Sequence, residues 1–147
     1  MPDPVQRSVD LFASGFMCAE SVLMALAEHQ GVACDAIPSL ATGLCAGISR
    51  TSNTCGALLG AIMGLGLAYG RDIAEDPPDP CFSQVQVLLD GFARRFGSTN
   101  CQELTGCDFL TDQGRADFRD KNIKEKQCFE YTREAVRLTL ARLEEQA

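Results

Sequence analysis

The sequence predicts an all-α protein: a single-domain, compact helical bundle of about six helices around a glycine-rich central helix. Apolar residues recur at helical spacing in most segments, no segment keeps the two-residue alternation of a half-buried strand, and β-branched residues are sparse. At 147 residues the chain has the size of one domain, and residues 1–147 contain no internal repeat and no sign of a second-domain boundary.

The expected helices follow one another along the chain, and most end at a glycine. In order, they span residues 5–13, 18–31, 37–43, 55–69, 81–96, 101–105 and 123–145. The prolines in 75–80 predict a surface connection, because proline lacks the amide proton that a helix needs. Segment 108–122 is polar and has no assigned element. The apolar stretch 55–69 is shorter than the roughly 20 residues of a membrane span, so it is predicted to be a buried central helix.

Charge and cysteine content narrow the classes of function. The chain carries 20 acidic and 13 basic residues, a net charge of -7, which opposes binding to nucleic acid and to anionic lipid. Residues 1–4 do not resemble a secretory signal, so a cytoplasmic location is expected. Thiols stay reduced in that compartment, and eight cysteines therefore favour metal binding or catalysis over a disulfide framework.

Three cysteines lie at predicted helix starts: Cys18, Cys55 and Cys101. Unpaired amides and the helix dipole at such a position stabilise an anion, and a thiolate is both a nucleophile and a metal ligand. Each cysteine alone is equally well explained as a small core residue. Cys128 falls on the apolar face of the last helix and is expected to point inward. Together these four predict one redox or metal site, assembled from distant parts of the chain because Cys-x-x-Cys is absent.

Gly56, Gly60 and Gly64 recur every four residues along the central helix. Each glycine costs about 1 kcal/mol relative to alanine inside a helix, so the stripe needs a compensating gain. Tight packing of another helix supplies one, and a cofactor lying against the stripe supplies another. Under the second reading Gly56 and Gly60 are cofactor-binding residues.

The chain resembles the C_GCAxxG_C_C family, small bacterial and archaeal proteins described as redox-active. The residues that carry the resemblance are 16–23 (FMCAESVL), 54–61 (TCGALLGA), 65–70 (LGLAYG), 96–97, 101–106 (CQELTG) and 128–131 (CFEY). The Cys-Gly-Ala-x-x-Gly core from Cys55 to Gly60 is the most specific of these. The resemblance covers most of the chain.

The resemblance implies that the four cysteines of the family map onto Cys18, Cys55, Cys101 and Cys128. Related domains occur in split-Soret cytochromes, which implies a [2Fe-2S] cluster here, with zinc as the alternative. Family members are often encoded near transporter genes, which implies association with a transporter. The segment before Cys55 departs from relatives, where it is richer in glycine.

The other candidate ligands are weaker. His29 is expected on the surface at a helix end. Haem is not expected, because the chain has one histidine and no Cys-x-x-Cys-His. Cys81 is predicted to be core, and Cys34 and Cys107 to be spectators in loops. Cys45 could replace one of the four cysteines or supply a resolving thiol.

Three functions follow from these patterns. The first is a cysteine-based redox or electron-transfer protein with a four-cysteine site that holds an iron-sulfur cluster, acting with a redox partner that the sequence does not name. The second is a metal-free dithiol/disulfide oxidoreductase, whose redox-active thiols are drawn from the same four residues. The third is a non-catalytic metal-binding accessory protein of a membrane transporter. Whether the chain is an enzyme, as an oxidoreductase would be, stays open at this point, and apolar surface on several helices points to a homodimer.

Overall fold

The computed structural model describes residues 2–145, and in this range every regular element is a helix. The elements are α1 (Pro4–Ala13), α2 (Cys18–His29), the 3₁₀ helix η1 (Ser39–Leu44), α3 (Cys45–Arg50), α4 (Gly56–Tyr69), α5 (Asp79–Phe96), α6 (Cys101–Thr105), α7 (Asp112–Asp120), the π-helical turn η2 (Lys124–Cys128) and α8 (Phe129–Glu144). The predicted all-α class is confirmed. The structure has eight helices labelled α in this range, where about six were predicted, and α3 and α7 have no predicted counterpart.

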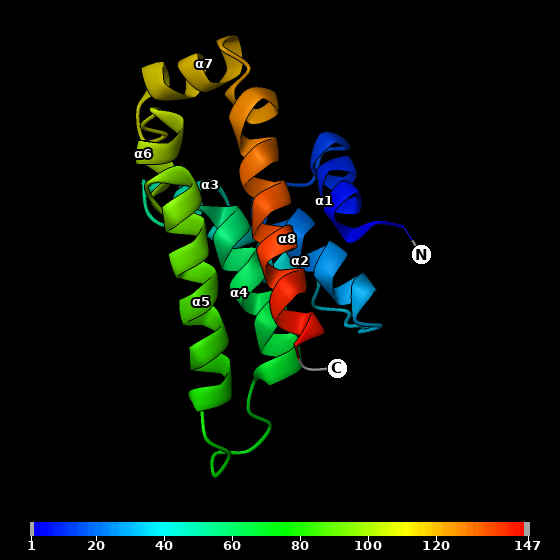
Figure 1. The fold of residues 1–147 in the computed structure, drawn as a ribbon. Coiled ribbons are helices and arrows are strands. Elements are labelled where there is room, and N and C mark those ends of the chain that lie inside the picture. The colour runs from blue at the N-terminus through cyan, green and yellow to red at the C-terminus, as the bar shows by residue number, and fades with distance from the viewer. Residues whose placement is uncertain (1, 146–147) are drawn as a thin grey trace.

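Helix α4 is the centre of the bundle, as predicted. Leu58, Ala61 and Leu65 of this helix are fully buried. Around α4 lie α2, α5 and α8, and their buried side chains complete one apolar core, which includes Val22, Leu26, Leu88, Phe92, Ala135 and Val136. The low polarity of α4 on every face therefore reflects burial among helices on several sides. Figure 1 shows α4 between α5 and α8, with α2 behind.

Several element boundaries differ from the prediction for local reasons. Helix α5 begins at Asp79, so Pro80 lies inside its first turn, where its missing amide proton costs nothing. Helix α7 forms in the segment that had no assigned element, and the Thr111 hydroxyl caps it by accepting from the Gly114 amide. The last helix is preceded by the π-helical turn η2, which contains Cys128.

Element α3 is a left-handed turn. Ala46, Gly47, Ile48 and Ser49 have φ values between 55° and 65°, and Arg50 has a φ of 69°. Residues other than glycine cost roughly 1–2 kcal/mol each in this left-handed conformation, because the Cβ atom crowds the following carbonyl oxygen. The turn is therefore a strained segment that its surroundings hold in place.

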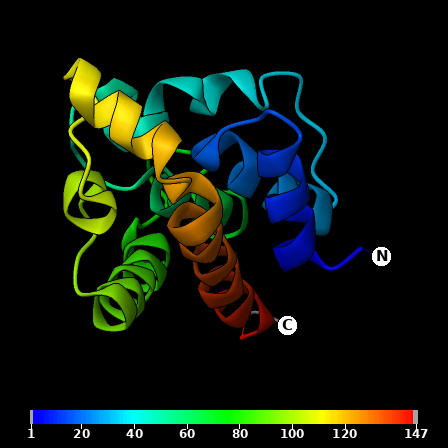
Figure 2. The ribbon, with the colours of Figure 1, turned by 90° about the horizontal axis from the view of Figure 1, so that it is seen from above.

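Helices α6 and α7 lie at one end of the bundle, and the loop between α4 and α5 lies at the opposite end (Figure 1). From above, α7 runs from the edge of the molecule toward its middle, where α8 begins (Figure 2). No helix in residues 2–145 combines the length and the apolar character that crossing a membrane requires.

Candidate functional site

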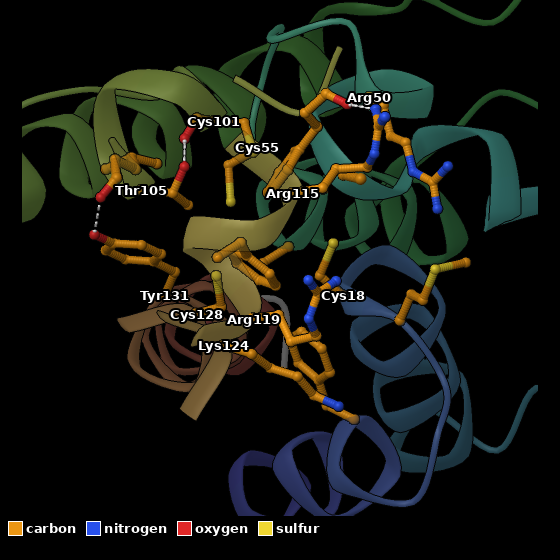
Figure 3. A pocket seen from close by; sticks show the side chains of 18 of the residues that line it. Cys18, Arg50, Cys55, Cys101, Thr105, Arg115, Arg119, Lys124, Cys128 and Tyr131 are labelled. Carbon is orange, nitrogen blue, oxygen red and sulfur yellow. Dashed lines mark hydrogen bonds between the residues drawn. The ribbon is translucent and has the colours of Figure 1, made fainter. Parts of the chain in front are cut away.

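A cavity of about 390 Å³ opens at the end of the bundle where α6 and α7 lie. Cys18, Cys55, Cys101 and Cys128 all line it, and each comes from a different part of the chain. Figure 3 shows the four side chains around one opening. The structure thus brings together the four residues that the sequence singled out, although up to 110 positions separate them.

Two backbone hydrogen bonds place Cys55 beside Cys101. The Cys55 amide donates to the Thr99 carbonyl (2.8 Å) and the Cys101 amide donates to the Asn53 carbonyl (2.8 Å), around a β-bridge between Thr54 and Asn100. The two segments before the cysteines are therefore paired like adjacent strands.

The expected helix-start geometry is present. Cys18 and Cys101 are the first residues of α2 and α6, and Cys55 is the residue just before α4. The expected lowering of the thiol pKa is absent. Burial raises the pKa of Cys55 even though the amides of Leu58 and Ala57 act against it. The helix-start interactions are therefore weaker here than the cost of placing a charge in a low-dielectric interior.

Burial has the same effect on the other two thiols of this group. It raises the pKa of Cys101 to about 12, and it also raises the pKa of Cys128. Cys55 adds to both shifts, and Cys101 adds to that of Cys128. In the absence of a compensating positive charge these three thiols hold their protons at neutral pH. A bound metal would displace those protons, because thiolate is the ligating form.

Cys45 is the important residue that sequence reasoning left ambiguous. It is buried, its thiol donates to the Ala41 carbonyl (3.6 Å), and it interacts with the Cys18 thiol. The interaction with Cys18 lowers the pKa of Cys45 to about 7, helped by the amides of Glu20 and Ala19 at the start of α2. The same contact, together with burial, raises the pKa of Cys18. The two cysteines therefore form a pair in which Cys45 carries the negative charge more easily.

The other cysteines and His29 lie apart from the cavity lining. Cys34 is exposed, and Cys81, which was expected in the core, is half-buried. Cys107 lies in the loop between α6 and α7, as expected, and is buried there in a small cluster with Cys101 and Phe109. His29 is exposed at the end of α2, as expected.

The glycine stripe of α4 faces α2. A Cβ atom on Gly60 would lie 2.6 Å from the Ala19 carbonyl oxygen, and one on Gly64 would lie 2.4–3.3 Å from atoms of Leu26. Close helix packing therefore explains these two glycines. Gly56 differs, because it lines the cavity and a Cβ there would lie 2.5 Å from the Cys18 sulfur.

Aromatic and basic side chains complete the cavity, and sequence reasoning did not identify them. They are Phe12, Phe109, Phe118 and Tyr131, and Arg50, Arg115, Arg119 and Lys124. Tyr131 lies in the 128–131 segment that carries the family resemblance, and the others have a weak signal because they are scattered over segments without a motif. Tyr131 is fixed by donating its hydroxyl proton to the Leu104 carbonyl (2.7 Å).

The four thiols surround the cavity without meeting at one point. Within residues 2–145 no three side chains of Cys, His, Asp or Glu converge closely enough to hold a single metal ion. The donor set is nevertheless chemically suited to a metal group, since cysteine sulfur is the usual ligand of iron-sulfur clusters and a frequent ligand of zinc. The adjoining cavity leaves space for a group of several atoms.

One family model matches most of the chain. The family model described as "Putative redox-active protein (C_GCAxxG_C_C)" matches residues 16–141. A protein of Archaeoglobus fulgidus, described as "Uncharacterized protein", is 28% identical over 151 residues, which cover 96% of this chain and 93% of the relative. No solved structure matches the chain.

Proposed function

Because the chain belongs to the C_GCAxxG_C_C family, we propose that it is a cysteine-based redox protein whose site is the cavity lined by Cys18, Cys55, Cys101 and Cys128. The observation that carries this proposal is the convergence of four thiols from distant segments on one cavity. We also propose a cytoplasmic location, because all eight cysteines are free and thiols persist in a reducing compartment.

We propose an iron-sulfur cluster as the group held by these four residues. Three features support it: the donors are soft sulfurs, the cavity beside them has a volume of about 390 Å³, and three of the thiols are buried where only a positive partner would favour their ionised form. The cluster would supply one-electron transfer. Zinc, which has no redox chemistry, would serve structure only.

The test is an absorption spectrum of protein purified without oxygen, combined with iron and sulfide analysis. We expect coloured protein with equal amounts of iron and sulfide, and loss of both in C55S and C101S. The matched control is C34S, which changes an exposed cysteine outside the cavity and should keep the colour. Colourless protein free of iron and sulfide would refute the cluster, and a stoichiometric amount of zinc in it would support the alternative.

A second candidate is metal-free dithiol chemistry, and the contact between Cys18 and Cys45 favours it. Cys18 lines the cavity, whereas the buried Cys45 does not. A small disulfide entering the cavity would be attacked by the Cys18 sulfur as the Cys45 thiolate takes up the Cys18 proton. This step forms a mixed disulfide and releases one thiolate, which then takes that proton from Cys45. Cys45 would then attack the Cys18 sulfur, forming the Cys18–Cys45 disulfide and releasing the second thiolate, so that two electrons pass to the small disulfide.

Thiol titration separates the two candidates. Under the dithiol mechanism, a mild disulfide oxidant removes two of the eight thiols, and peptide mass spectrometry finds Cys18 joined to Cys45. The loss is reversed by a dithiol reductant and prevented by C45S, whereas C34S leaves it unchanged. Eight thiols that persist through the oxidation would exclude this mechanism.

A further inference from the structure

The mouth of the cysteine cavity has a charge opposite to that of the protein. Four of the chain's 13 basic side chains line the cavity, and in the described chain none of the 20 acidic ones does. These four are Arg50, Arg115, Arg119 and Lys124, and Figure 3 shows them beside the thiols. In a chain with a net charge of -7, this distribution concentrates positive potential at one opening.

The protein itself neutralises only part of this positive charge, because Arg115 pairs with Asp112 and Arg119 with Asp120. Within residues 2–145 neither Arg50 nor Lys124 forms an ion pair, and the Lys124 ammonium lies over the Phe12 ring, 5.1 Å from its centroid. Arg119 is 3.6 Å from the carboxylate of Asp120, with both side chains more than two thirds exposed. Exposed pairs of this kind contribute little and are easily exchanged for another partner.

Aromatic side chains form much of the remaining cavity lining. Phe12 contributes to it, Phe109 and Phe118 stack edge to face at 4.9 Å between centroids, and Tyr131 lies near Cys128. A molecule in the cavity therefore meets cations, aromatic rings and sulfur, and Arg50 and Arg119 are exposed to solvent. The volume of about 390 Å³ lies in the range of small-molecule sites.

We propose that this cavity binds a small organic anion, with its carboxylate or other negative group among Arg50, Arg115, Arg119 and Lys124 and its apolar, sulfur-bearing part against the aromatic walls. This proposal rests on the proposed function, because it names the substrate class of that redox site. A polyanion such as nucleic acid is disfavoured, because the rest of the surface repels it.

The test compares two aromatic disulfides of similar shape. One, 5,5′-dithiobis(2-nitrobenzoate), carries two carboxylates, and the other, 4,4′-dithiodipyridine, is uncharged. With either reagent a cysteine thiolate attacks one sulfur, forms a mixed disulfide and releases an aryl thiolate. Protein purified without oxygen is treated with each reagent, and peptide mass spectrometry gives the rate at each cysteine. The exposed Cys34 is the internal reference.

We expect the ratio of the charged to the uncharged rate to be higher at Cys18 than at Cys34. In R50Q/R119Q this ratio at Cys18 should fall on the order of ten-fold, because the field that concentrates the anion is weakened. The matched control is R94Q/R137Q, which removes two arginines outside the cavity lining and has the same net charge as R50Q/R119Q. In the wild type, raising the salt concentration should slow only the charged reagent at Cys18.

Two results would overturn the proposal. One is a ratio at Cys18 that R50Q/R119Q leaves unchanged, which would restrict the cations to balancing charge on the thiolates or a cluster. The other is an equal fall in R94Q/R137Q, which would reduce the effect to net charge. Since both reagents act on the same preparation, a bound cluster slows both and leaves the ratio readable. Iron analysis of that preparation reports separately on the cluster.

Discussion

Thr54 and Asn100 form a single antiparallel bridge, and this pair sets Cys55 beside Cys101. The Asn100 side chain supports the bridge twice: its amide group donates to the Ser52 carbonyl (2.7 Å), and its oxygen accepts from the Glu103 amide (3.0 Å) at the start of α6. One residue therefore joins the two cysteine-bearing segments and caps the helix that Cys101 begins.

N100A should destabilise the fold by about 2 kcal/mol, because it removes the helix cap and the hydrogen bond to Ser52 together. N100S retains a capping hydroxyl and should cost about half as much. Urea unfolding of the three proteins measures both values. Equal losses in the two variants would show that the cap contributes nothing.

Gly60 and Gly66 lie on different faces of α4 and should respond oppositely to alanine. G60A places a Cβ atom 2.6 Å from the Ala19 carbonyl oxygen, and we expect a loss of about 1–3 kcal/mol in unfolding free energy. G66A meets no atom within 4 Å, so the higher helix propensity of alanine should stabilise the fold by up to about 1 kcal/mol. Thermal unfolding compares them. A stable G60A would mean that α2 and α4 are not in close contact.

Buried thiols should make the metal-free protein less stable at alkaline pH. Folded Cys101 keeps its proton up to a pKa of about 12, whereas the unfolded chain releases it near 9. Between these values the unfolded state binds fewer protons, so the unfolding free energy falls as pH rises, by at most about 1.4 kcal/mol per pH unit for this residue. Urea unfolding from pH 8 to 10.5 should show a shallower slope in C101A.

Cys45 should affect the pH dependence of the unfolding free energy in the opposite direction to Cys101, so its variant is the control. Its pKa is lowered to about 7 in the fold, so its contribution to stability is full above the unfolded value near 9 and is lost as pH falls through 7. C45A should therefore remove a rise in stability between pH 7 and 9 and leave the alkaline decline. If C101A and C45A gave the same pH profile, the opposite shifts of the two thiols would be refuted.

The left-handed turn α3 offers a stabilising substitution. Ala46 has a φ of 56°, a region that glycine adopts without crowding, so A46G should gain up to about 1 kcal/mol after its greater loss of backbone freedom is counted. The same change in the right-handed helix α5, A93G, should lose about 1 kcal/mol. Chemical unfolding measures both, and a destabilised A46G would show that the methyl group has an essential contact.

The helical spacing of apolar residues in the sequence predicted α1, α2, α4, α5 and α8. It could not reveal the left-handed turn, because Ala46, Ile48 and Ser49 are residues that rarely adopt positive φ, and only their tertiary surroundings hold them there. Helix α7 was missed for a different reason. Its stretch is polar, so no apolar stripe marked it.

Some features of the site could be predicted from the sequence and others could not. Local context at helix starts was enough to select Cys18, Cys55 and Cys101, because that context is a property of neighbouring residues. The contact of Cys45 with Cys18 and the cations of the cavity lining depend on how distant segments meet. The acidity of the thiols could not be predicted either, since it is set by how deeply each sulfur is buried.

The spread of the four cysteines has a consequence for how the protein is made. Cys18 emerges from the ribosome more than a hundred residues before Cys128, and α8 is synthesised after α1, α2, α4 and α5, on which it packs. During translation the first three thiols therefore lack their fourth partner and the helix that shields them. Any group that needs all four can be inserted only after Cys128 has left the ribosome, and until then the other three sulfurs are open to oxidation.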